Sequence, residues 1–171
     1  QRLSEKMASD AVVISDAGSA YYVCSQAIKI KDEQRYITSG AQAEMGYTIP
    51  AAIGVCYAKN KQEVIGVTGE GSFQMNLQEL QTIVHNQLPI KLFIWNNGGY
   101  LSIKATQKKF FKGDYIGIDD ASGISFPELE KLSDAYGIHY IKISNTNELD
   151  EKLDEIIKFD GALICEVMCD I

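Results

Sequence analysis

The chain has 171 residues, of which 46% are hydrophobic and 23% are charged, an ordinary composition for one globular domain with a full core. Its net charge of −7 argues against a nucleic-acid-binding surface, and no apolar run approaches the roughly 20 residues that a membrane span needs. The cysteines have neither CxxC nor zinc-site spacing, and no signal peptide is recognisable, so we expect buried, reduced thiols in a cytoplasmic protein. These cysteines are Cys24, Cys56, Cys165 and Cys169.

Two short segments in the first part of the chain are interpreted as strands: the apolar run 11–14, which we expect to be buried, and 35–38. The first run leads into a loop in which Gly18 can turn the chain and Ser19 can cap the next helix. Such a strand–glycine–helix junction is a site for an anion. After the second segment, the small and apolar residues of 47–58 indicate a buried helix.

The middle of the chain contains two further apolar runs, and each breaks at a polar, glycine-rich loop. The run 64–67 precedes an amphipathic helix, in which Asn76 and Glu79 have the spacing of a capping box. The run 90–95 then ends at the loop Asn96–Gly99. Two parallel strands joined by a crossover helix place both loops at one edge of the sheet, where ligands bind in open α/β folds.

The residue types of these two loops indicate an anion held through a cation. Gly69 and Gly71 allow the backbone to approach a ligand closely, and the helix start that follows offers N–H groups. Glu70 and Asn97 supply hard oxygen atoms, and a carbonyl just past Asn97 can supply another. Because Mg²⁺ prefers one or two carboxylates together with phosphate oxygens, we expect a diphosphate bound through a divalent ion.

The segment 100–120 combines lysines with phenylalanines, a pattern also found in nucleic-acid-binding surfaces. The acidic chain as a whole disfavours that reading. We expect the segment to fold over a bound cofactor or to pack on another domain.

The last third of the chain continues the alternation of helices and strands. Helices are expected after a capping box at Ser125–Glu128 and after Asn145, and strands at 138–143 and 162–168. The whole pattern predicts one three-layer α/β/α domain, residues 1–171, around a central, mainly parallel sheet.

The sequence Gly69-Glu70-Gly71, followed after residues 72–95 by Asn96-Asn97, resembles the GDG…NN signature of thiamin diphosphate enzymes. The surrounding GSFQMNLQEL and LPIKLFIWNN, and the upstream SGAQAEMGYTIPAAIG, resemble the C-terminal cofactor-binding domain of the acetolactate synthase group. The resemblance implies a thiamin diphosphate-binding fold. Since the chain opens at Gln1 in helical sequence, we expect the C-terminal part of a longer enzyme.

The resemblance also implies a role for each motif residue. Mg²⁺ would be bound by Glu70, Asn97 and the backbone carbonyl of Gly99. The remaining positions would hold the cofactor, with the diphosphate at the glycine loops and the pyrimidine ring at Ala43 and Met45. These positions are Gly18, Ser19, Ala43, Met45, Gly69, Gly71, Ser72, Asn97, Gly99 and Tyr100.

Three departures from the family pattern bear on activity. Glu70 stands where the family has Asp, so its carboxylate lies one methylene further out. Ser19 and Ala20 replace the Gln and His of the first diphosphate loop, and Ser102 and Thr106 replace the Met and Trp found near the substrate in anabolic acetolactate synthases. The glutamate that activates the cofactor belongs, in the family, to a separate domain, so no catalytic residue is expected in this chain.

The implied activity is decarboxylation of a 2-oxo acid, followed by carboligation or protonation of the resulting carbanion. The partner would be the pyrimidine-binding domain of the same or a neighbouring subunit in a homo-oligomer, and any FAD of the full-length protein would bind outside this chain. Alone, the domain is expected to bind thiamin diphosphate weakly and not to turn over. Three alternatives stay open: a cofactor-binding subunit of a two-subunit decarboxylase, a non-catalytic remnant, and another nucleotide binder.

Overall fold

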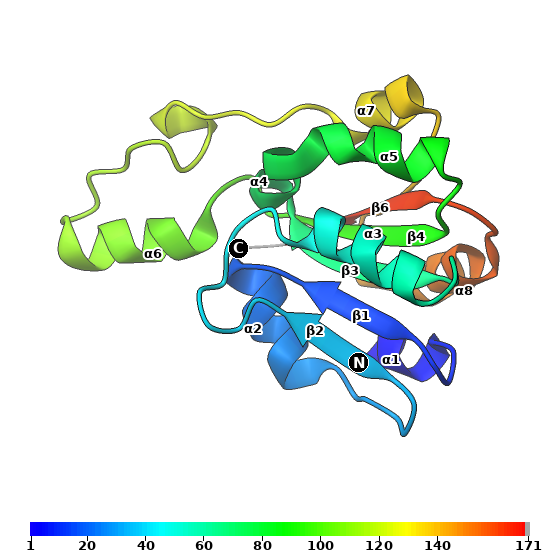
Figure 1. The fold of residues 1–171 in the computed structure, drawn as a ribbon. Helices are drawn as coiled ribbons and strands as arrows, with labels where there is room; N and C mark the ends of the chain where they lie inside the picture. Colours follow the sequence, from blue (N-terminus) through cyan, green and yellow to red (C-terminus); the bar gives the residue numbers. More distant parts are fainter. Residues whose placement is uncertain (170–171) are drawn as a thin grey trace.

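A computed structural model describes residues 1–169, so the last two residues of the expected domain, 170 and 171, lie outside the described part. The centre of the fold is a six-stranded sheet with the order β2-β1-β3-β4-β6-β5, and every strand pairing in it is parallel (Figure 1). This confirms the predicted α/β fold. The strands are β1 Val12–Ser15, β2 Arg35–Thr38, β3 Val64–Gly69, β4 Ile90–Asn96, β5 His139–Ile143 and β6 Leu163–Met168.

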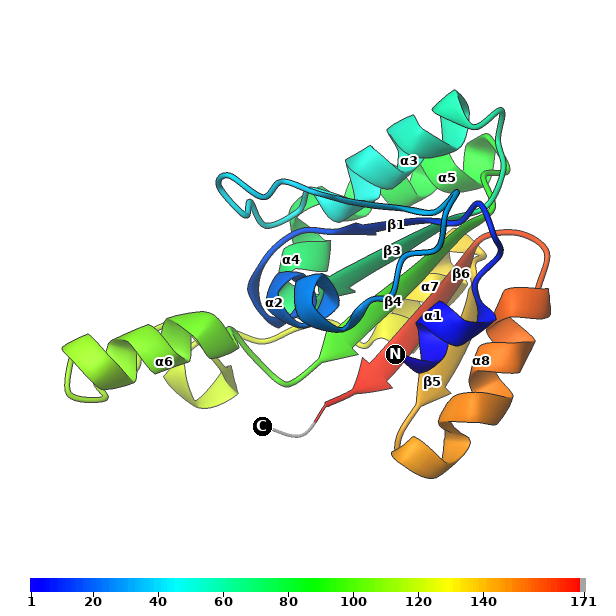
Figure 2. The ribbon, with the colours of Figure 1, turned by 90° about the horizontal axis from the view of Figure 1, so that it is seen from below.

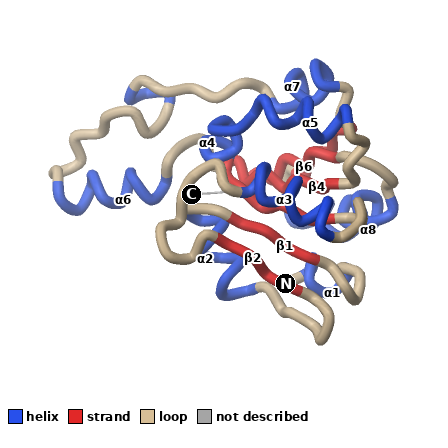
Figure 3. The backbone as a smooth tube through the Cα atoms, in the orientation of Figure 1, coloured by secondary structure: helices blue, strands red, loops and turns tan. Residues whose placement is uncertain are grey.

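Helices cover both faces of the sheet and create two separate halves of the core (Figures 2 and 3). One face packs against α3 Thr48–Ala58, α5 Leu80–His85 and α7 Leu129–Tyr136. The other face packs against α1 Arg2–Lys6, α2 Gly18–Ala27 and α8 Leu149–Lys158. Because the central strands are buried on both faces, they are mainly apolar rather than alternating, with Lys91 on β4 as a buried exception.

Glycine at one position of β3 allows α3 to lie close to the sheet. A Cβ atom on Gly66 would lie 2.8 Å from both Leu92 Cδ2 and Thr48 Cγ2, which is shorter than any ordinary carbon–carbon contact. Thr48 opens α3 and donates a hydrogen bond from Oγ1 to the main-chain carbonyl of Val67, at 3.3 Å. This close packing fixes the start of α3 next to the carboxyl end of β3.

The connection from β3 to β4 is broken into three short helices instead of the single helix predicted: α4 Glu70–Phe73, a 3₁₀ helix Gln74–Glu79, and α5. Asn76 has non-helical dihedral angles, φ −133° and ψ 34°, because its side-chain amide donates to the carbonyl of Gly46 at 2.8 Å. The predicted capping box of Asn76 and Glu79 is therefore wrong.

The other two predicted helix starts have different outcomes. No side-chain cap opens α7, where Glu128 instead pairs with Lys131, so the capping box at Ser125–Glu128 is also wrong. Asn145 does act as a cap. Its Oδ1 accepts from the amide N–H of Asn147 at 3.0 Å, at the start of the 3₁₀ helix Thr146–Glu148 that leads into α8.

A buried ammonium group holds the turn between α8 and β6. Lys91 on β4 has no exposed side-chain area, and its Nζ donates to the carbonyls of Phe159 at 2.5 Å and Gly161 at 2.8 Å. The carboxylate of Glu63 lies 3.7 Å away. Burial lowers the pKa of Lys91, and Glu63 partly opposes that shift.

Helix α6, Leu101–Phe110, projects away from the sheet and returns through a loop that contains the 3₁₀ helix Asp120–Ser122 (Figure 1). This arm carries large apolar side chains that are exposed to solvent: Leu101, Ile103, Phe110, Phe111, Tyr115 and Ile116. Its expected packing over a cofactor or on another domain stays a prediction. None of the described helices combines the length and apolar character that crossing a bilayer requires.

Candidate cofactor site

The strand order reverses direction between β1 and β3, and the loops that follow these two strands flank this switch point. A cavity of about 320 Å³ opens there, at the carboxyl edge of the sheet, between the loops after β1, β2, β3 and β4. Every residue proposed from the sequence as a cofactor or metal ligand lines this one cavity. They are Gly18, Ser19, Ala43, Met45, Gly69, Glu70, Gly71, Ser72, Asn97, Gly99 and Tyr100.

A fully buried carboxylate, Asp16, joins the first and third of these loops. Its Oδ2 accepts from Ser72 Oγ at 2.6 Å and from Thr68 Oγ1 at 2.8 Å, and its Oδ1 accepts from the amide N–H of Ala17 at 2.7 Å. Asp16 was not among the residues predicted from the sequence. Its position directly after a buried strand, before a glycine, was the available signal.

The hydroxyl of Ser72 is already satisfied within the protein, because it donates to Asp16 and accepts from the amide N–H of Gly46 at 2.8 Å. Ser19 does not cap α2: the helix begins at Gly18, its N-cap residue is Ala17, and no side-chain cap bond is present. The predicted capping role of Ser19 is therefore wrong, although the residue lines the cavity.

Glu70 lines the cavity, and only 3% of its surface is exposed. Its Oε1 accepts from the amide N–H of Gly99 at 2.8 Å and from that of Asn97 at 3.3 Å. The extra methylene of glutamate therefore lets the carboxylate reach the loop after β4. Burial raises the pKa of Glu70, against the lowering effect of these main-chain N–H groups.

The side-chain oxygen of Asn97 is buried and has no hydrogen-bond partner. Within residues 1–169, only this atom and Thr38 Oγ1 are orphaned in this way; Thr38 is the last residue of β2, and Asn97 directly follows β4. An unpaired buried amide oxygen costs about 1–3 kcal/mol, so its retention needs a reason. A buried carboxylate and an unpartnered amide oxygen on neighbouring loops fit the oxygen ligands that Mg²⁺ prefers.

Any cation here would depend on few protein ligands. Nowhere in the described part of the chain do three His, Cys, Asp or Glu side chains lie close enough together to hold a metal ion. Glu70, Asn97 and a carbonyl supply a single negative charge, so phosphate oxygens and water would have to complete an octahedral Mg²⁺ site.

Close backbone approach at two glycines shapes the cavity wall. A Cβ atom on Gly71 would lie 2.1 Å from the ring of Tyr100, and one on Gly99 would lie 2.3 Å from the carbonyl oxygen of Ile118. The amide N–H of Tyr100 donates to that same carbonyl at 2.8 Å. Any side chain at either glycine would therefore displace the loop after β4.

Ala43 adopts a left-handed backbone conformation with φ 53°, which costs a residue with a Cβ atom roughly 1 kcal/mol. It lies in a turn closed by its own amide N–H, which donates to the carbonyl of Ser39 at 2.8 Å. Local strain at a cavity is a common feature of ligand sites. Met45, two residues later, is half-buried and lines the same cavity.

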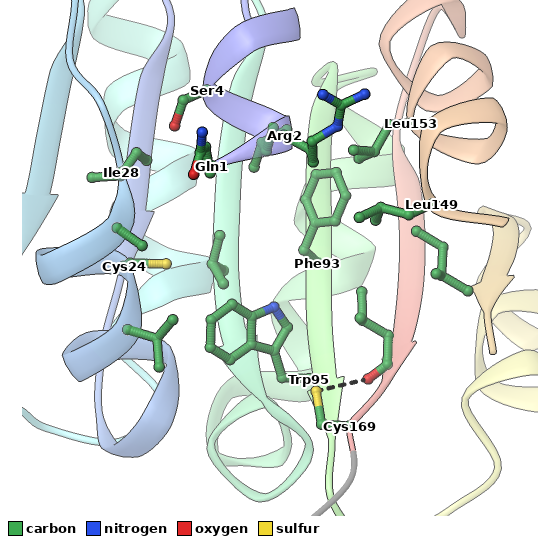
Figure 4. A pocket seen from close by; sticks show the side chains of 16 residues that line it. Gln1, Arg2, Ser4, Cys24, Ile28, Phe93, Trp95, Leu149, Leu153 and Cys169 are labelled. Carbon is green, nitrogen blue, oxygen red and sulfur yellow. Dashed lines mark hydrogen bonds between the residues drawn. The ribbon is translucent and has the colours of Figure 1, made fainter. Parts of the chain in front are cut away.

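A second cavity, of about 360 Å³, lies between the sheet and helices α1, α2 and α8 (Figure 4). Its lining is almost entirely apolar, with Phe93, Trp95 and Leu153 around the centre. Burial raises the pKa of the Cys24 thiol in this cavity to about 11, so it stays protonated at neutral pH. Its one cationic side chain among the described lining residues, Arg2, is paired with Glu5 and Asp150, and none of the glycine-rich loops lines this cavity, so the carboxyl edge is the candidate site.

Known proteins that are similar to this chain belong to the family that the sequence motifs indicate. A family model described as the thiamine pyrophosphate enzyme, C-terminal TPP binding domain, matches residues 16–167. The acetolactate synthase isozyme 2 large subunit of Escherichia coli (strain K12) is 31% identical over 170 residues, 99% of this chain and 30% of that protein.

Acetolactate synthase large subunits of Cyanidium caldarium and Porphyra purpurea are each 34% identical, over 94% and 96% of this chain and 27% and 28% of those proteins. The chain therefore spans less than a third of the length of these relatives. Thiamine pyrophosphate is another name for thiamin diphosphate. The chain belongs to the thiamin diphosphate enzymes and is a C-terminal cofactor-binding domain of the acetolactate synthase group.

Proposed function

We propose that this domain binds thiamin diphosphate through Mg²⁺, as the C-terminal part of a longer acetolactate synthase-like enzyme. That enzyme would decarboxylate a 2-oxo acid and either transfer the resulting carbanion to an acceptor or protonate it. The observation that carries the proposal is the unpartnered, buried Oδ1 of Asn97 on the loop that also binds the buried carboxylate of Glu70. A divalent ion between them would satisfy the amide oxygen and neutralise the carboxylate.

In this proposal the metal ligands are Glu70, Asn97 and the carbonyl of Gly99. A carboxylate accepts several bonds at once, so Glu70 can hold the N–H groups of the loop and the cation together. Bound thiamin diphosphate would supply the carbanion stabilisation that decarboxylation of a 2-oxo acid requires. The protein groups hold and orient the cofactor.

The diphosphate would contact main-chain N–H groups of Gly71 and Ser72 and the loop at Gly18 and Ser19. The Ser72 hydroxyl has no proton left for the ligand, because that proton is donated to Asp16. Its proposed contact therefore uses the backbone. Asp16 acts indirectly, since it fixes Ser72 relative to the first loop.

The pyrimidine ring would lie against Met45 and the carbonyl of Ala43. The strained, left-handed turn at Ala43 supports this assignment, because it directs the following main chain along the cavity wall. The activating glutamate and the other half of the site would come from the pyrimidine-binding domain of the same or a neighbouring subunit of a homo-oligomer.

A cytoplasmic location is part of the same proposal. Among the described residues, the buried Cys24, Cys56 and Cys165 form no disulfide. Burial raises the pKa of the Cys165 thiol to about 12 and that of Cys24 to about 11, so neither is poised for thiolate chemistry. Buried, protonated thiols suit a reducing compartment.

The test is calorimetric titration of thiamin diphosphate into the full-length natural protein, with Mg²⁺ and then with EDTA. Binding that requires the metal supports the enzyme, and turnover of a 2-oxo acid identifies the donor. Absence of metal-dependent binding by the full-length protein would instead indicate a non-catalytic remnant. Co-purification of a separate chain that restores turnover would favour a two-subunit enzyme.

A further inference from the structure

A second buried carboxylate lies behind the loop that follows β4. Glu166 interrupts the apolar strand β6, and only 5% of its surface is exposed. It is paired in register with Ile94 on β4 and with Lys142 on β5, so it lies between two neighbouring strands. Nothing in the proposed contacts of the cofactor uses this residue.

Two side chains donate hydrogen bonds to the Glu166 carboxylate, and a third forms an ion pair with it. Asn96 Nδ2 donates to Oε1 at 2.6 Å, the hydroxyl of Tyr140 donates to Oε2, and Lys142 Nζ lies 3.2 Å from Oε2. Burial alone raises the pKa of Glu166, but these donors outweigh it and lower the pKa, so the group is a carboxylate at neutral pH. Tyr140 and Lys142 come from the adjacent edge strand β5.

The hydrogen bonds of Asn96 also fix the conformation of the residues that follow it. Its side-chain Oδ1 accepts from the amide N–H of Gly98 at 3.1 Å, and its main-chain carbonyl accepts from Cys169 N at 2.9 Å. Gly98 lies between Asn97 and Gly99, whose own amide N–H groups donate to Glu70. The loop is therefore held from two sides: by Glu70 in the cavity and by Glu166, through Asn96, from behind.

We propose that Glu166 is a positioning residue for the metal site: it fixes the amide plane of Asn96, which in turn fixes the turn that presents Asn97 Oδ1 and the Gly99 carbonyl. Without an acceptor at Glu166, the Asn96 amide would be free to rotate and Gly98 would lose its partner. Outer groups that orient metal ligands commonly change metal affinity by 10–100-fold. The inference rests on the proposed function, because the loop is a metal site only if the domain binds Mg²⁺.

Three substitutions in the full-length protein separate positioning from general support of the sheet. Glu166→Met keeps the length of the side chain and removes the acceptor. Glu166→Gln keeps an oxygen for Asn96, because its amide group can face the Tyr140 hydroxyl. Lys142→Met is the matched control, since it removes only the ion pair of a side chain that is 45% exposed.

The first measurement needs neither metal nor cofactor. Hydrogen–deuterium exchange of the segment 97–99 should be at least about tenfold faster in Glu166→Met than in the natural protein, and unchanged in Lys142→Met. Asn96→Ala removes the side chain that bonds both Glu166 and the amide N–H of Gly98, and it leaves the core intact. This variant should show the same increase in the exchange rate. Equal exchange in all variants would overturn the positioning role, whatever the domain binds.

The second measurement is Mn²⁺ binding, followed by the loss of the free-ion electron paramagnetic resonance signal in saturating thiamin diphosphate. We expect the dissociation constant for Mn²⁺ to rise by about 10–100-fold in Glu166→Met and Asn96→Ala, with recovery in Glu166→Gln. The double variant should be no weaker than either single one, because both act through one path. Additive losses would indicate two independent effects and overturn the inference.

The two measurements also distinguish this inference from the proposed function. If the natural protein binds no Mn²⁺ in the presence of the cofactor, the proposed function fails and the inference about the metal site fails with it. If the natural protein binds Mn²⁺ and Glu166→Met binds it equally well, only the role of Glu166 is overturned.

Discussion

Glu70→Gln separates the two roles of this side chain. The carboxamide has the same length, and its oxygen can still accept from the amide N–H groups of Gly99 and Asn97, which lie 2.8 and 3.3 Å from Glu70 Oε1. The substitution removes the only charge among the proposed metal ligands. Because burial raises the pKa of Glu70, its ionised form opposes folding of the cofactor-free protein above that raised pKa. We expect the variant to be at least as stable as the natural protein at pH 7.

The expected loss of metal affinity follows from the charge that disappears. A divalent cation and one negative charge 4 Å apart attract by about 8 kcal/mol at an effective dielectric constant of 20. Desolvation of the carboxylate offsets part of this attraction, so we expect a loss of about 3 kcal/mol, or on the order of 100-fold in the dissociation constant for Mg²⁺. Calorimetric titration of Mg²⁺ in the presence of thiamin diphosphate measures the loss, and urea unfolding without cofactor measures the stability.

Glu63→Gln is the matched control, because burial also raises the pKa of Glu63, which precedes β3 at the opposite end from Glu70. The control should leave Mg²⁺ affinity unchanged. If Glu70→Gln retains affinity within about threefold, less than 0.7 kcal/mol, Glu70 is not the charged ligand of the site.

Three other changes test the packing around the site. Gly71→Ala would place a Cβ atom 2.1 Å from the ring of Tyr100, so the free energy of unfolding measured in urea should fall by about 1–3 kcal/mol. The control is Gly54→Ala in α3, where a Cβ atom meets nothing within 4 Å. This variant should raise the free energy of unfolding by about 0.5–1 kcal/mol. Lys91→Met leaves two main-chain carbonyls without their donor, so the free energy of unfolding in the same assay should fall by about 1–3 kcal/mol, with cofactor affinity unchanged. Equal stability of the variant and the natural protein would mean that the buried ammonium group makes no net contribution to the free energy of unfolding. The lowered pKa of Glu166 predicts a contribution to stability that is complete above the ordinary glutamate pKa of about 4.3 and disappears as the pH falls through the lowered value. In Glu166→Gln the free energy of unfolding should therefore fall less steeply as the pH is lowered. Equal slopes of the free energy of unfolding against pH in the variant and the natural protein would contradict the assignment.

The strands and the cavity loops could be predicted because their signals are local. A parallel strand that is buried on both faces is an uninterrupted apolar run, and each of the runs ending near Ser15, Gly69 and Asn96 stops at glycine or a polar residue. The carboxyl ends of parallel strands meet at one edge by topology alone. The structure places the residues of the candidate site, which strand topology and the family resemblance selected, around one cavity.

The helix caps could not be predicted in the same way, because distant groups compete for the capping side chains. The Asn76 amide donates to Gly46, thirty residues earlier, and the helix is interrupted at Asn76 as a result. Asn145 has no such distant partner in its cap, and there the local rule holds. Sequence spacing gives the opportunity for a cap, whereas the tertiary contact decides whether it forms.

The buried carboxylates were missed for a related reason. Asp16 is held by Thr68 and Ser72, and Glu166 by Asn96 and Tyr140, so every partner is remote in the sequence except for the amide next to Asp16. An acidic residue within an apolar strand, as in the run that contains Glu166, is the one local signal that a partner exists. The sequence does not show which residue that partner is.

Three local violations of ordinary folding rules lie together at the carboxyl edge of the sheet, although left-handed backbone also occurs at Asn60, Lys61, Gln87 and Lys112. Glu70 buries a carboxylate whose ionised form is disfavoured, Asn97 buries an oxygen without a partner, and Ala43 holds a left-handed turn. Each such feature costs about 1–3 kcal/mol in a protein without ligand. A cation with its diphosphate would relieve the first two directly, since it offers charge to one and coordination to the other. The rest of the domain has two apolar core layers on a six-stranded sheet. The stability of these layers offsets the unfavourable features at this edge, so the edge keeps its conformation without a ligand.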